Sequence, residues 1–342
     1  MRIRGLGRIQ NGIRTVQNRI GANAVILLYH RITESESDPQ RLAVSPDNFS
    51  QQMEILAATT CPVPLAELPA RLKNQKLSER PLSCVTFDDG YADNLEEAAP
   101  ILAQYNIPAT VFAATAAING PHEFWVDELE RLLLQTALSP RLELKIGGQV
   151  HAWSFSAEPD TGEYWDVLQP PRRTAQQAYL EIAAQIRNLI PDEREKVLTQ
   201  LFEWAGISRQ PRPSHRTMTE EDLHRLTADG LISVGAHTVN HPVLSALKPH
   251  DQAFEITESR ARLEQILDRP VKTFAYPYGR VQDYSRQTVK LVQKAGFTCA
   301  CSNFPRLANR WTDPFQLPRF IADNRDGMFF EKQLAEFMQT WC

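Results

Sequence analysis

Two adjacent aspartates, Asp88 and Asp89, follow an apolar run in the stretch Thr-Phe-Asp-Asp-Gly at positions 86–90. Neighbouring carboxylates repel and raise each other's pKa, so a buried pair persists mainly where a cation or a proton-transfer role compensates the charge. The same residues also suit a solvated turn, because aspartate and glycine are favoured there. The pair alone leaves a catalytic site and a simple turn equally open.

Two histidines, His237 and His241, stand four residues apart at the end of another apolar run, in His-Thr-Val-Asn-His-Pro. Neutral imidazoles at this spacing are common metal ligands, although a pair of histidines by itself is more often structural. The structural alternative weakens because the aspartates also follow a predicted strand. Two histidines and one carboxylate leave coordination positions open for water and substrate, which favours a catalytic metal site over a structural one.

A third segment, Tyr-Pro-Tyr-Gly-Arg at 276–280, again follows an apolar run. Pro277 and Gly279 constrain the backbone, so the amide of Tyr278 could face an oxyanion that develops during a reaction. Alternatively, the aromatic turn only packs at the edge of the sheet. Taken alone, the segment favours packing.

Short apolar, β-branched runs alternate along the chain with longer amphipathic stretches, which predicts an α/β protein with a mainly parallel sheet. The carboxyl ends of parallel strands converge on one face of a barrel, so the three segments above are expected to meet there. Helix starts are predicted at Ser45 and Thr219, and a helix end at Gly296. The predicted strands are 24–29, 83–87, 109–114, 232–236, 271–275, 298–302 and 317–322.

Residues 116–216 depart from this alternation of short apolar runs and longer amphipathic stretches. They contain a hairpin pattern around Gly147-Gly148 and two amphipathic stretches at 174–189 and 192–204. We interpret the region as a mainly helical lobe on the rim of the barrel, not as a separately folding domain. Near its start, Phe-Trp-Val-Asp at 124–127 either lines a sugar-binding cleft or forms a helix that packs on the barrel, and the pattern favours packing.

The chain has 342 residues, 42% of them hydrophobic, and 37 basic against 41 acidic side chains. This composition is typical of a globular protein, and its mild acidity gives no electrostatic footprint for nucleic acid. The five cysteines form no Cys-x-x-Cys pair, so neither a disulfide framework nor a thiolate zinc site is predicted.

Residues 1–23 are rich in arginine and carry apolar residues at spacings of three and four. This pattern predicts a basic amphipathic helix that either packs on its own domain or contacts an anionic membrane surface. The sequence shows no secretory signal and no membrane-spanning run. The expected location is therefore the cytoplasm, with peripheral attachment to the inner face of the membrane as the alternative.

The order Thr-Phe-Asp-Asp-Gly, then His-Thr-x-x-His, then Pro-Tyr-Gly resembles the polysaccharide deacetylase family, also known as carbohydrate esterase family 4. The resemblance covers residues 24–115 and 217–322 and leaves the inserted lobe outside. It implies a distorted (β/α) barrel of about seven strands with a divalent metal. It also implies removal of N-acetyl, or sometimes O-acetyl, groups from sugars.

Residue by residue, the resemblance makes Asp88 the catalytic base and the Tyr278 amide the oxyanion contact. It makes Asp89, His237 and His241 the ligands of one metal ion. Zinc is the expected ion, while cobalt, nickel and manganese also suit this ligand set.

Two motifs depart from the family pattern, and a third cannot be recognised around 297–303. Ala275 stands where the family has an arginine that orients the base, and Arg319 stands where it has a histidine that acts as general acid. We hypothesise that Arg319 reaches Asp88 from another strand and keeps it ionised. We also hypothesise that His30, at the end of the first strand, supplies the leaving-group proton; the alternative is a buried structural histidine.

The sequence therefore predicts a metal-dependent carbohydrate N-deacetylase. Its expected partner is an N-acetylated glycan in a polysaccharide, an oligosaccharide or a lipid-linked intermediate, and not a nucleic acid. Removal of another acyl group, such as formyl or O-acetyl, is an alternative. A catalytically impaired glycan-binding protein on the same fold is the competing class, supported only by Ala275 and Arg319.

Overall fold

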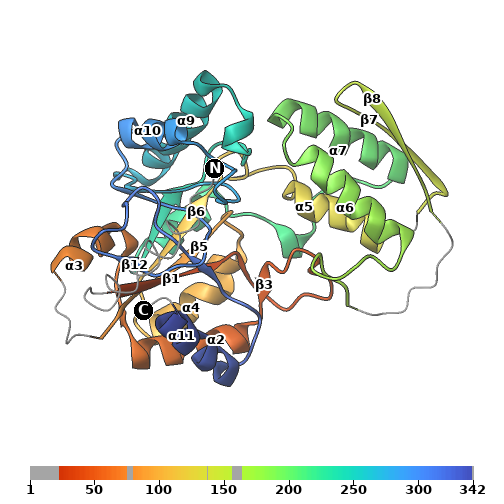
Figure 1. The fold of residues 1–342 in the computed structure, drawn as a ribbon. Helices are drawn as coiled ribbons and strands as arrows, with labels where there is room; N and C mark the ends of the chain where they lie inside the picture. The colour runs from red at the N-terminus through yellow and green to blue at the C-terminus, as the bar shows by residue number, and fades with distance from the viewer. Residues whose placement is uncertain (1–22, 75–79, 137, 156–163, 341–342) are drawn as a thin grey trace, which may run out of the picture.

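The computed structural model describes residues 23–74, 80–136, 138–155 and 164–340. The predicted basic segment 1–23 lies outside them, apart from Asn23. A barrel built on a parallel sheet forms the larger part of the molecule, and a lobe projects from one side of it (Figure 1). Among the described helices, none is both long and apolar enough to cross a membrane.

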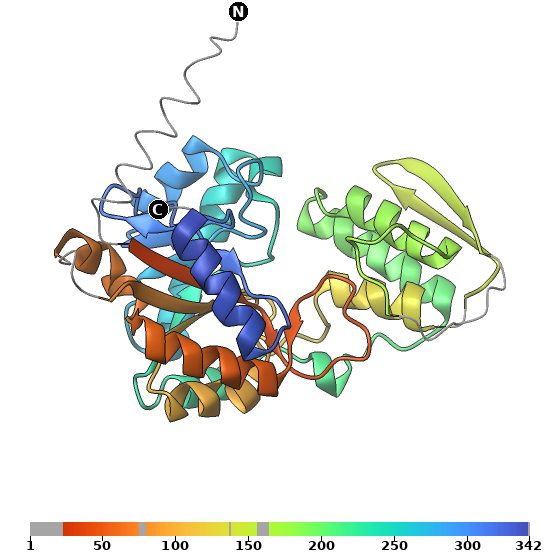
Figure 2. The same cartoon turned by 60° about the horizontal axis from the view of Figure 1, so that its bottom comes forward.

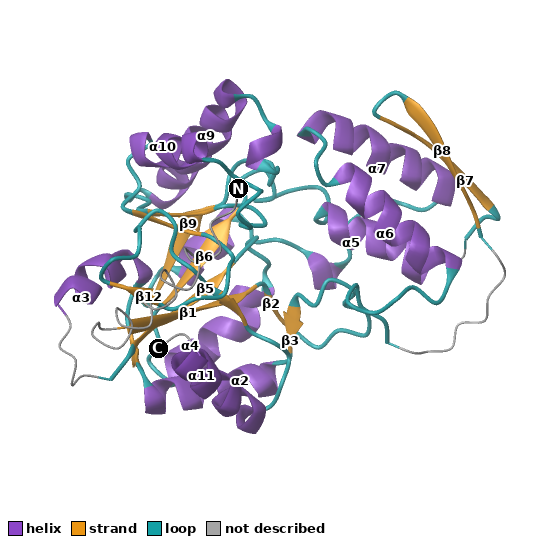
Figure 3. Cartoon of the chain, viewed as in Figure 1, coloured by secondary structure: helices purple, strands orange, loops and turns teal. Residues whose placement is uncertain are grey.

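The main sheet runs in the order β11-β10-β9-β6-β5-β1, and neighbouring strands along this path are parallel. The strands lie inside a ring of helices (Figure 3). Their bounds are β1 (Asn23–Tyr29), β5 (Leu82–Phe87), β6 (Ala109–Ala113), β9 (Ile232–Ala236), β10 (Thr273–Ala275), β11 (Cys299–Cys301) and β13 (Phe320–Ile321). The shorter strands are β2 (Arg31–Ile32), β3 (Ala43–Val44), β4 (Cys61–Pro62) and β12 (Ala308–Asn309).

The ring of strands is completed by the segment 317–321. Leu317 bridges to Cys301 at the end of β11, and β13 pairs in parallel with β1. The predicted distorted (β/α) barrel is therefore confirmed, with every predicted strand present within a few residues of its expected bounds. The distortion lies in the last strands, because β10, β11 and β13 are only two or three residues long.

The helices begin where capping residues predict them to begin. Ser45 accepts a hydrogen bond from the Asn48 amide, and Thr219 forms a capping box with Asp222. Helix α11 packs across α2 on the outside of the sheet (Figure 2). The helices around the barrel are α2 (Pro46–Thr59), α3 (Leu68–Asn74), α4 (Ala99–Gln104), α8 (Glu220–Leu226), α9 (Pro249–Leu267), α10 (Arg286–Lys294) and α11 (Gly327–Thr340), with single turns η1 (Leu65–Glu67), η2 (Asn94–Ala98) and η5 (Leu244–Ala246).

The inserted lobe is mainly helical, as expected, and carries the predicted hairpin. Gly147 and Gly148 both have positive φ, which allows a two-residue turn between antiparallel strands. The lobe has a hydrophobic core of its own, distinct from the barrel core, in which Leu129, Tyr179 and Leu201 are fully buried. Its elements are α5 (Trp125–Glu130), β7 (Arg141–Ile146), β8 (Gln149–Ser154), α6 (Thr174–Ile186) and α7 (Pro191–Ala205), with single turns η3 (Arg131–Gln135) and η4 (Pro213–His215).

Candidate active site

Asp88 follows β5 and lies buried against Arg319, which stands just before β13. The guanidinium donates two parallel hydrogen bonds, from Nη1 to Oδ1 and from Nη2 to Oδ2, each 2.7 Å long. Its Nε–H donates to the carbonyl oxygen of Ser302 at 2.9 Å, which fixes the plane of the group. The structure thus shows the expected ion pair, formed across β1, which lies between β5 and β13.

This ion pair controls the charge of Asp88. Burial by itself raises the pKa of the carboxyl, but the charges of Arg319 and His237 and the hydrogen bonds from Arg319 outweigh it. The pKa of Asp88 is therefore held below its ordinary value of 3.8. An ionised carboxylate in a water-poor site is a suitable proton acceptor.

Asp89, His237 and His241 come together beside this pair, and one possible ligand atom from each lies within 4.8 Å of the others. The Oδ1 atom of Asp89 is 3.6 Å from His237 Nε2 and 3.3 Å from His241 Nε2. The Nδ1 atom of His237 is 2.8 Å from the carbonyl oxygen of Ala275. The ring therefore carries its proton on Nδ1, and its Nε2 lone pair faces Asp89.

These three residues fit a divalent metal. Asp89 Oδ1 is buried without a hydrogen-bond partner among the described residues. Burial, and then the neighbouring charge of Asp88, raise the pKa of Asp89 well above its ordinary value. A cation at this position would supply the missing partner and favour the ionised form. Two imidazole nitrogens and one carboxylate oxygen form a donor set that suits zinc and leaves coordination positions open.

The backbone around these residues is held in an unusual conformation. Asp89, Thr238, His241 and Tyr278 all have positive φ, between 52° and 75°. Such angles cost free energy in non-glycine residues and are concentrated at functional sites. Glu255 of α9 supports the turn between the histidines, because its carboxylate accepts from the amides of residues 239 and 240 at 2.8 and 2.9 Å.

Tyr278 lies over His241, with ring centroids 4.8 Å apart. Its hydroxyl accepts a hydrogen bond from the indole nitrogen of Trp125 at 3.1 Å, and the guanidinium carbon of Arg187 is 4.1 Å from its ring centroid. Its backbone N–H makes no hydrogen bond within the described part of the chain. The amide is therefore unpaired within the described part of the chain, and two lobe residues contact the side chain.

His30 follows β1 at the same end of the barrel, and its ring lies close enough to feel the charges of Asp88, Arg319 and His237. Burial lowers the pKa of His30 to about 4. The His30 ring makes no hydrogen bond to any described residue. A buried structural histidine, the alternative considered above, would be expected to make one. A neutral imidazole here can donate a proton from one nitrogen when it takes one up at the other.

Comparison with known proteins shows that the chain is similar to polysaccharide deacetylases. A family model described as Polysaccharide deacetylase matches residues 76–136 and 204–300. The chain is also 21% identical over 302 residues to the Bacillus subtilis (strain 168) protein named Putative polysaccharide deacetylase YxkH, across 87% of this chain and 71% of that protein.

Solved structures extend the comparison to nearly the whole chain. The Streptococcus pyogenes deacetylase PplD in complex with acetate has a TM-score of 0.58 at 18% identity, and covers 93% of this chain and 99% of that chain. IcaB from Ammonifex degensii has a TM-score of 0.57 at 19% identity, and covers 93% and 98%. The resemblance to the polysaccharide deacetylase family is therefore confirmed, and the two matched segments carry it. This resemblance supports glycan deacetylation by a hydrolase as the activity.

The two segments matched by the polysaccharide deacetylase model contain Asp88, His237 and Tyr278, together with the other candidate metal ligands. They contain neither His30 nor Arg319. The matched region also extends into the first helix of the lobe, beyond the boundary at residue 115 expected from the motifs.

Sequence reasoning missed the lobe residues that approach the site. Arg187 directly follows α6 and contacts Tyr278, and Arg194 lies on α7 and contacts the His241 loop. Each reads in the sequence as a charged residue on the polar face of an amphipathic helix, so no local signal distinguishes it. For Trp125, the sequence pattern favours packing over lining a cleft. The structure shows both, because Trp125 is buried and also lines a cavity.

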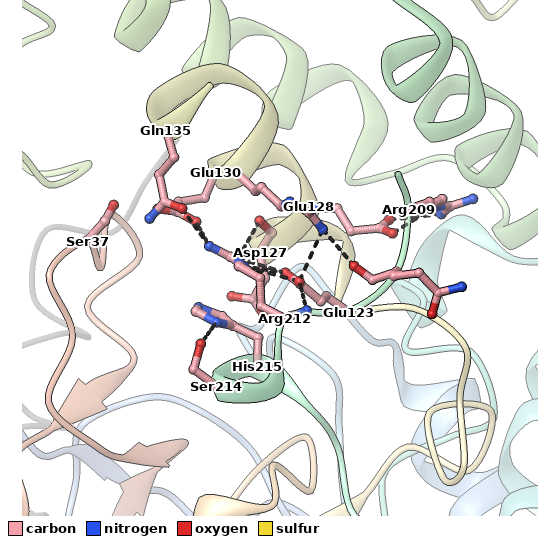
Figure 4. Close-up of polar contacts among 12 residues, drawn as sticks. Ser37, Glu123, Asp127, Glu128, Glu130, Gln135, Arg209, Arg212, Ser214 and His215 are labelled. Atoms are coloured by element: carbon pink, nitrogen blue, oxygen red, sulfur yellow. Dashed lines mark hydrogen bonds and ion pairs between the residues drawn. The ribbon is translucent and has the colours of Figure 1, made fainter. Parts of the chain in front are cut away.

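Ion pairs tie together the two connections between lobe and barrel (Figure 4). Arg212 donates from Nε to Oε1 of Glu123 at 3.1 Å and from Nη2 to Oε2 at 2.7 Å, and from Nη1 to Glu130 at 2.9 Å. Arg209 forms a two-pronged pair with Glu128 at 2.8 Å for both bonds. Because these acids precede or lie on α5 and the arginines lie on the returning segment, the pairs fix the lobe on the rim.

Asp127 in this cluster predicts a pH-dependent stability. Burial raises its pKa to about 7, although Tyr91 donates a 2.7 Å hydrogen bond to it. Between about pH 4 and pH 7 the folded chain binds a proton that the unfolded chain has released, so this group's contribution to the unfolding free energy falls as pH rises, by up to about 4 kcal/mol.

Asp127→Asn keeps an acceptor for Tyr91 and removes the titration. Urea unfolding of both proteins at several pH values across this window should show the variant gaining stability relative to the native chain as pH rises. Parallel pH curves for the two proteins would contradict the assignment.

Proposed function

We propose that this protein is a metal-dependent hydrolase that removes N-acetyl groups from the amino sugars of a polysaccharide, an oligosaccharide or a lipid-linked glycan. The observation that carries the proposal is the buried Asp88–Arg319 pair beside the cluster of Asp89, His237 and His241. An ionised base next to three convergent metal donors is an arrangement that suits amide hydrolysis by water.

Asp89, His237 and His241 would hold the ion, with zinc as the best fit to the donor set. When bound, it supplies Lewis-acid chemistry at the acetyl carbonyl. Asp88 takes a proton from the attacking water as the new C–O bond forms. The free Tyr278 amide donates to the oxyanion of the tetrahedral intermediate. The C–N bond then breaks. His30 donates a proton to the sugar nitrogen, which leaves as a free amine, and the acyl group is released as acetate.

The acyl group is tested by following both products. The zinc-loaded protein is incubated with oligomers of N-acetylglucosamine, with their N-formyl counterparts and with an O-acetylated neutral oligomer. The proposal predicts equal amounts of acetate and new free amine from the first substrate at the highest rate. Release of formate, or of acetate from the ester alone, would replace the N-acetyl assignment.

His30→Asn tests the route of the leaving-group proton. We expect turnover to fall by about 100-fold, the size of a general-acid contribution, with one limb of the pH–rate profile lost and zinc content unchanged. His250→Asn is the matched control, because the side chain of His250 is 92% exposed on α9. A His30→Asn profile that keeps both limbs would remove this residue from the mechanism.

A further inference from the structure

A cavity of about 280 Å³ lies between the lobe and the barrel and reaches the candidate metal site. His241 forms part of its barrel side, and Phe124, Trp125, Arg194 and Leu198 contribute from the lobe and its connection. This volume is near the lower end of small-molecule sites and offers room for one substituted sugar unit. The cavity therefore adjoins the place where the acetamide would react without containing the Asp88 base.

Arg194 brings an uncompensated positive charge to this cavity. The residue is only 7% exposed, and its Nη1 atom is buried without a hydrogen-bond partner among the described residues. Its Nη2 donates to the backbone carbonyl of Asn240 at 2.8 Å, and its guanidinium lies 5.9 Å from the ring centroid of Trp125. No carboxylate pairs with it in the described part of the chain. Buried charges are normally paired. The Arg194 guanidinium is an exception, because no carboxylate of the described chain is its partner.

Three of the four carboxylates that line the cavity are already engaged, and the fourth, Asp192, is exposed at the start of α7. Glu128 and Glu195 both pair with Arg209, and Glu123 pairs with Arg212. A second donor also lacks a partner, because the Nδ1 atom of His241 is buried and makes no hydrogen bond to a described residue. Two unsatisfied donor groups beside one cavity call for a ligand group that accepts hydrogen bonds and carries negative charge.

We propose that this cavity is a subsite for an oxyanion, a carboxylate or a phosphate, on the sugar unit next to the one that is deacetylated, and that Arg194 binds it. This inference rests on the proposed function for the identity of the ligand as a glycan. It makes the substrate an anionic glycan and assigns Arg194, a residue of the inserted lobe, to substrate selection. A bidentate guanidinium contact gives such a group both affinity and orientation.

The test uses ligands without any amide, so that it does not depend on turnover. Calorimetric titration of the zinc-loaded protein compares a β-1,4-linked glucuronic acid tetramer with cellotetraose, which is the same chain with its carboxylates reduced. A 6-phosphorylated cellotetraose provides the phosphate arm. The proteins are the native chain, Arg194→Gln, Arg194→Lys and, as a matched control from the same lobe, Arg141→Gln, whose side chain is 69% exposed.

We expect the native chain and Arg141→Gln to bind one of the anionic tetramers at least about ten-fold more tightly than cellotetraose. Arg194→Gln should lose this preference while binding cellotetraose unchanged, and Arg194→Lys should keep part of it. The arm that shows the preference identifies the oxyanion.

Equal affinity of the native chain for all three tetramers would overturn the inference. Equal weakening of all ligands by Arg194→Gln would also overturn it, because that pattern reflects only support of the Asn240 loop. Neither result bears on acetate release, so failure of the subsite and failure of the deacetylase proposal remain distinguishable.

Discussion

Replacing Arg319 by alanine is expected to reduce deacetylation by more than about 100-fold and to destabilise the fold by about 3–5 kcal/mol. Arg319 is 1% exposed, and both of its terminal nitrogens bind Asp88. Without it the Asp88 carboxylate is buried and unpaired, so burial raises its pKa and the base becomes protonated. Metal content should persist, because none of the three candidate ligands donates to or accepts from Arg319.

Three further variants separate the two effects of this change. Arg319→Lys retains the charge and loses the two-pronged geometry, so intermediate activity is expected. Combining Asp88→Asn with Arg319→Met removes both charges and should recover much of the stability but no activity. Arg71→Ala breaks an exposed pair with Glu67 and should cost less than about 1 kcal/mol. Full activity in Arg319→Ala would contradict the role assigned to it.

Replacing Asp89 by alanine is expected to weaken zinc binding by more than about 100-fold and to abolish measurable deacetylation. Loss of a direct ligand should exceed the 10–100-fold effect of losing a residue that only supports a ligand. Asp89 is also the carboxylate whose Oδ1 atom lacks a partner in the described structure. Its replacement should therefore leave the metal-free chain as stable as before, or more stable, because an unpaired buried group is removed.

Thermal unfolding with and without zinc measures both effects together. The native chain should gain stability on zinc addition, since an ion that binds only the folded state stabilises it, and Asp89→Ala should gain almost none. Asp251→Asn is the control, because Asp251 also lies beside a histidine but on the exposed surface. A stoichiometric zinc ion in Asp89→Ala would contradict the ligand assignment.

The longer strands of the barrel could be predicted, because each of them corresponds to a run of apolar residues in the sequence that is bounded by turn residues. β5 and β9 are examples, with all or most of their residues buried. The two-residue strands β2, β3, β4 and β12 were not predicted, since two residues carry no periodic pattern. Their pairings arise from the tertiary fold instead.

The candidate site could be predicted where its residues end strands, as Asp88 and His237 do. Arg319 could be placed near Asp88 because β13 and β5 both pair with β1, so the two residues belong to strands on either side of β1. Arg194 and Glu255 could not be predicted, because their contacts with the His241 loop depend on how α7 and α9 pack against that loop. No local pattern records a contact of that kind.

Metal-dependent deacetylation is tested most directly by measuring acetate released from N-acetylglucosamine oligomers by the metal-stripped protein, before and after divalent ions are restored, with Asp88→Asn treated in parallel. We predict negligible release from the stripped protein, recovery with zinc or another divalent ion, and no recovery in Asp88→Asn even though that variant binds the metal. Release that is indifferent to metal, or that survives in metal-loaded Asp88→Asn, would contradict this prediction.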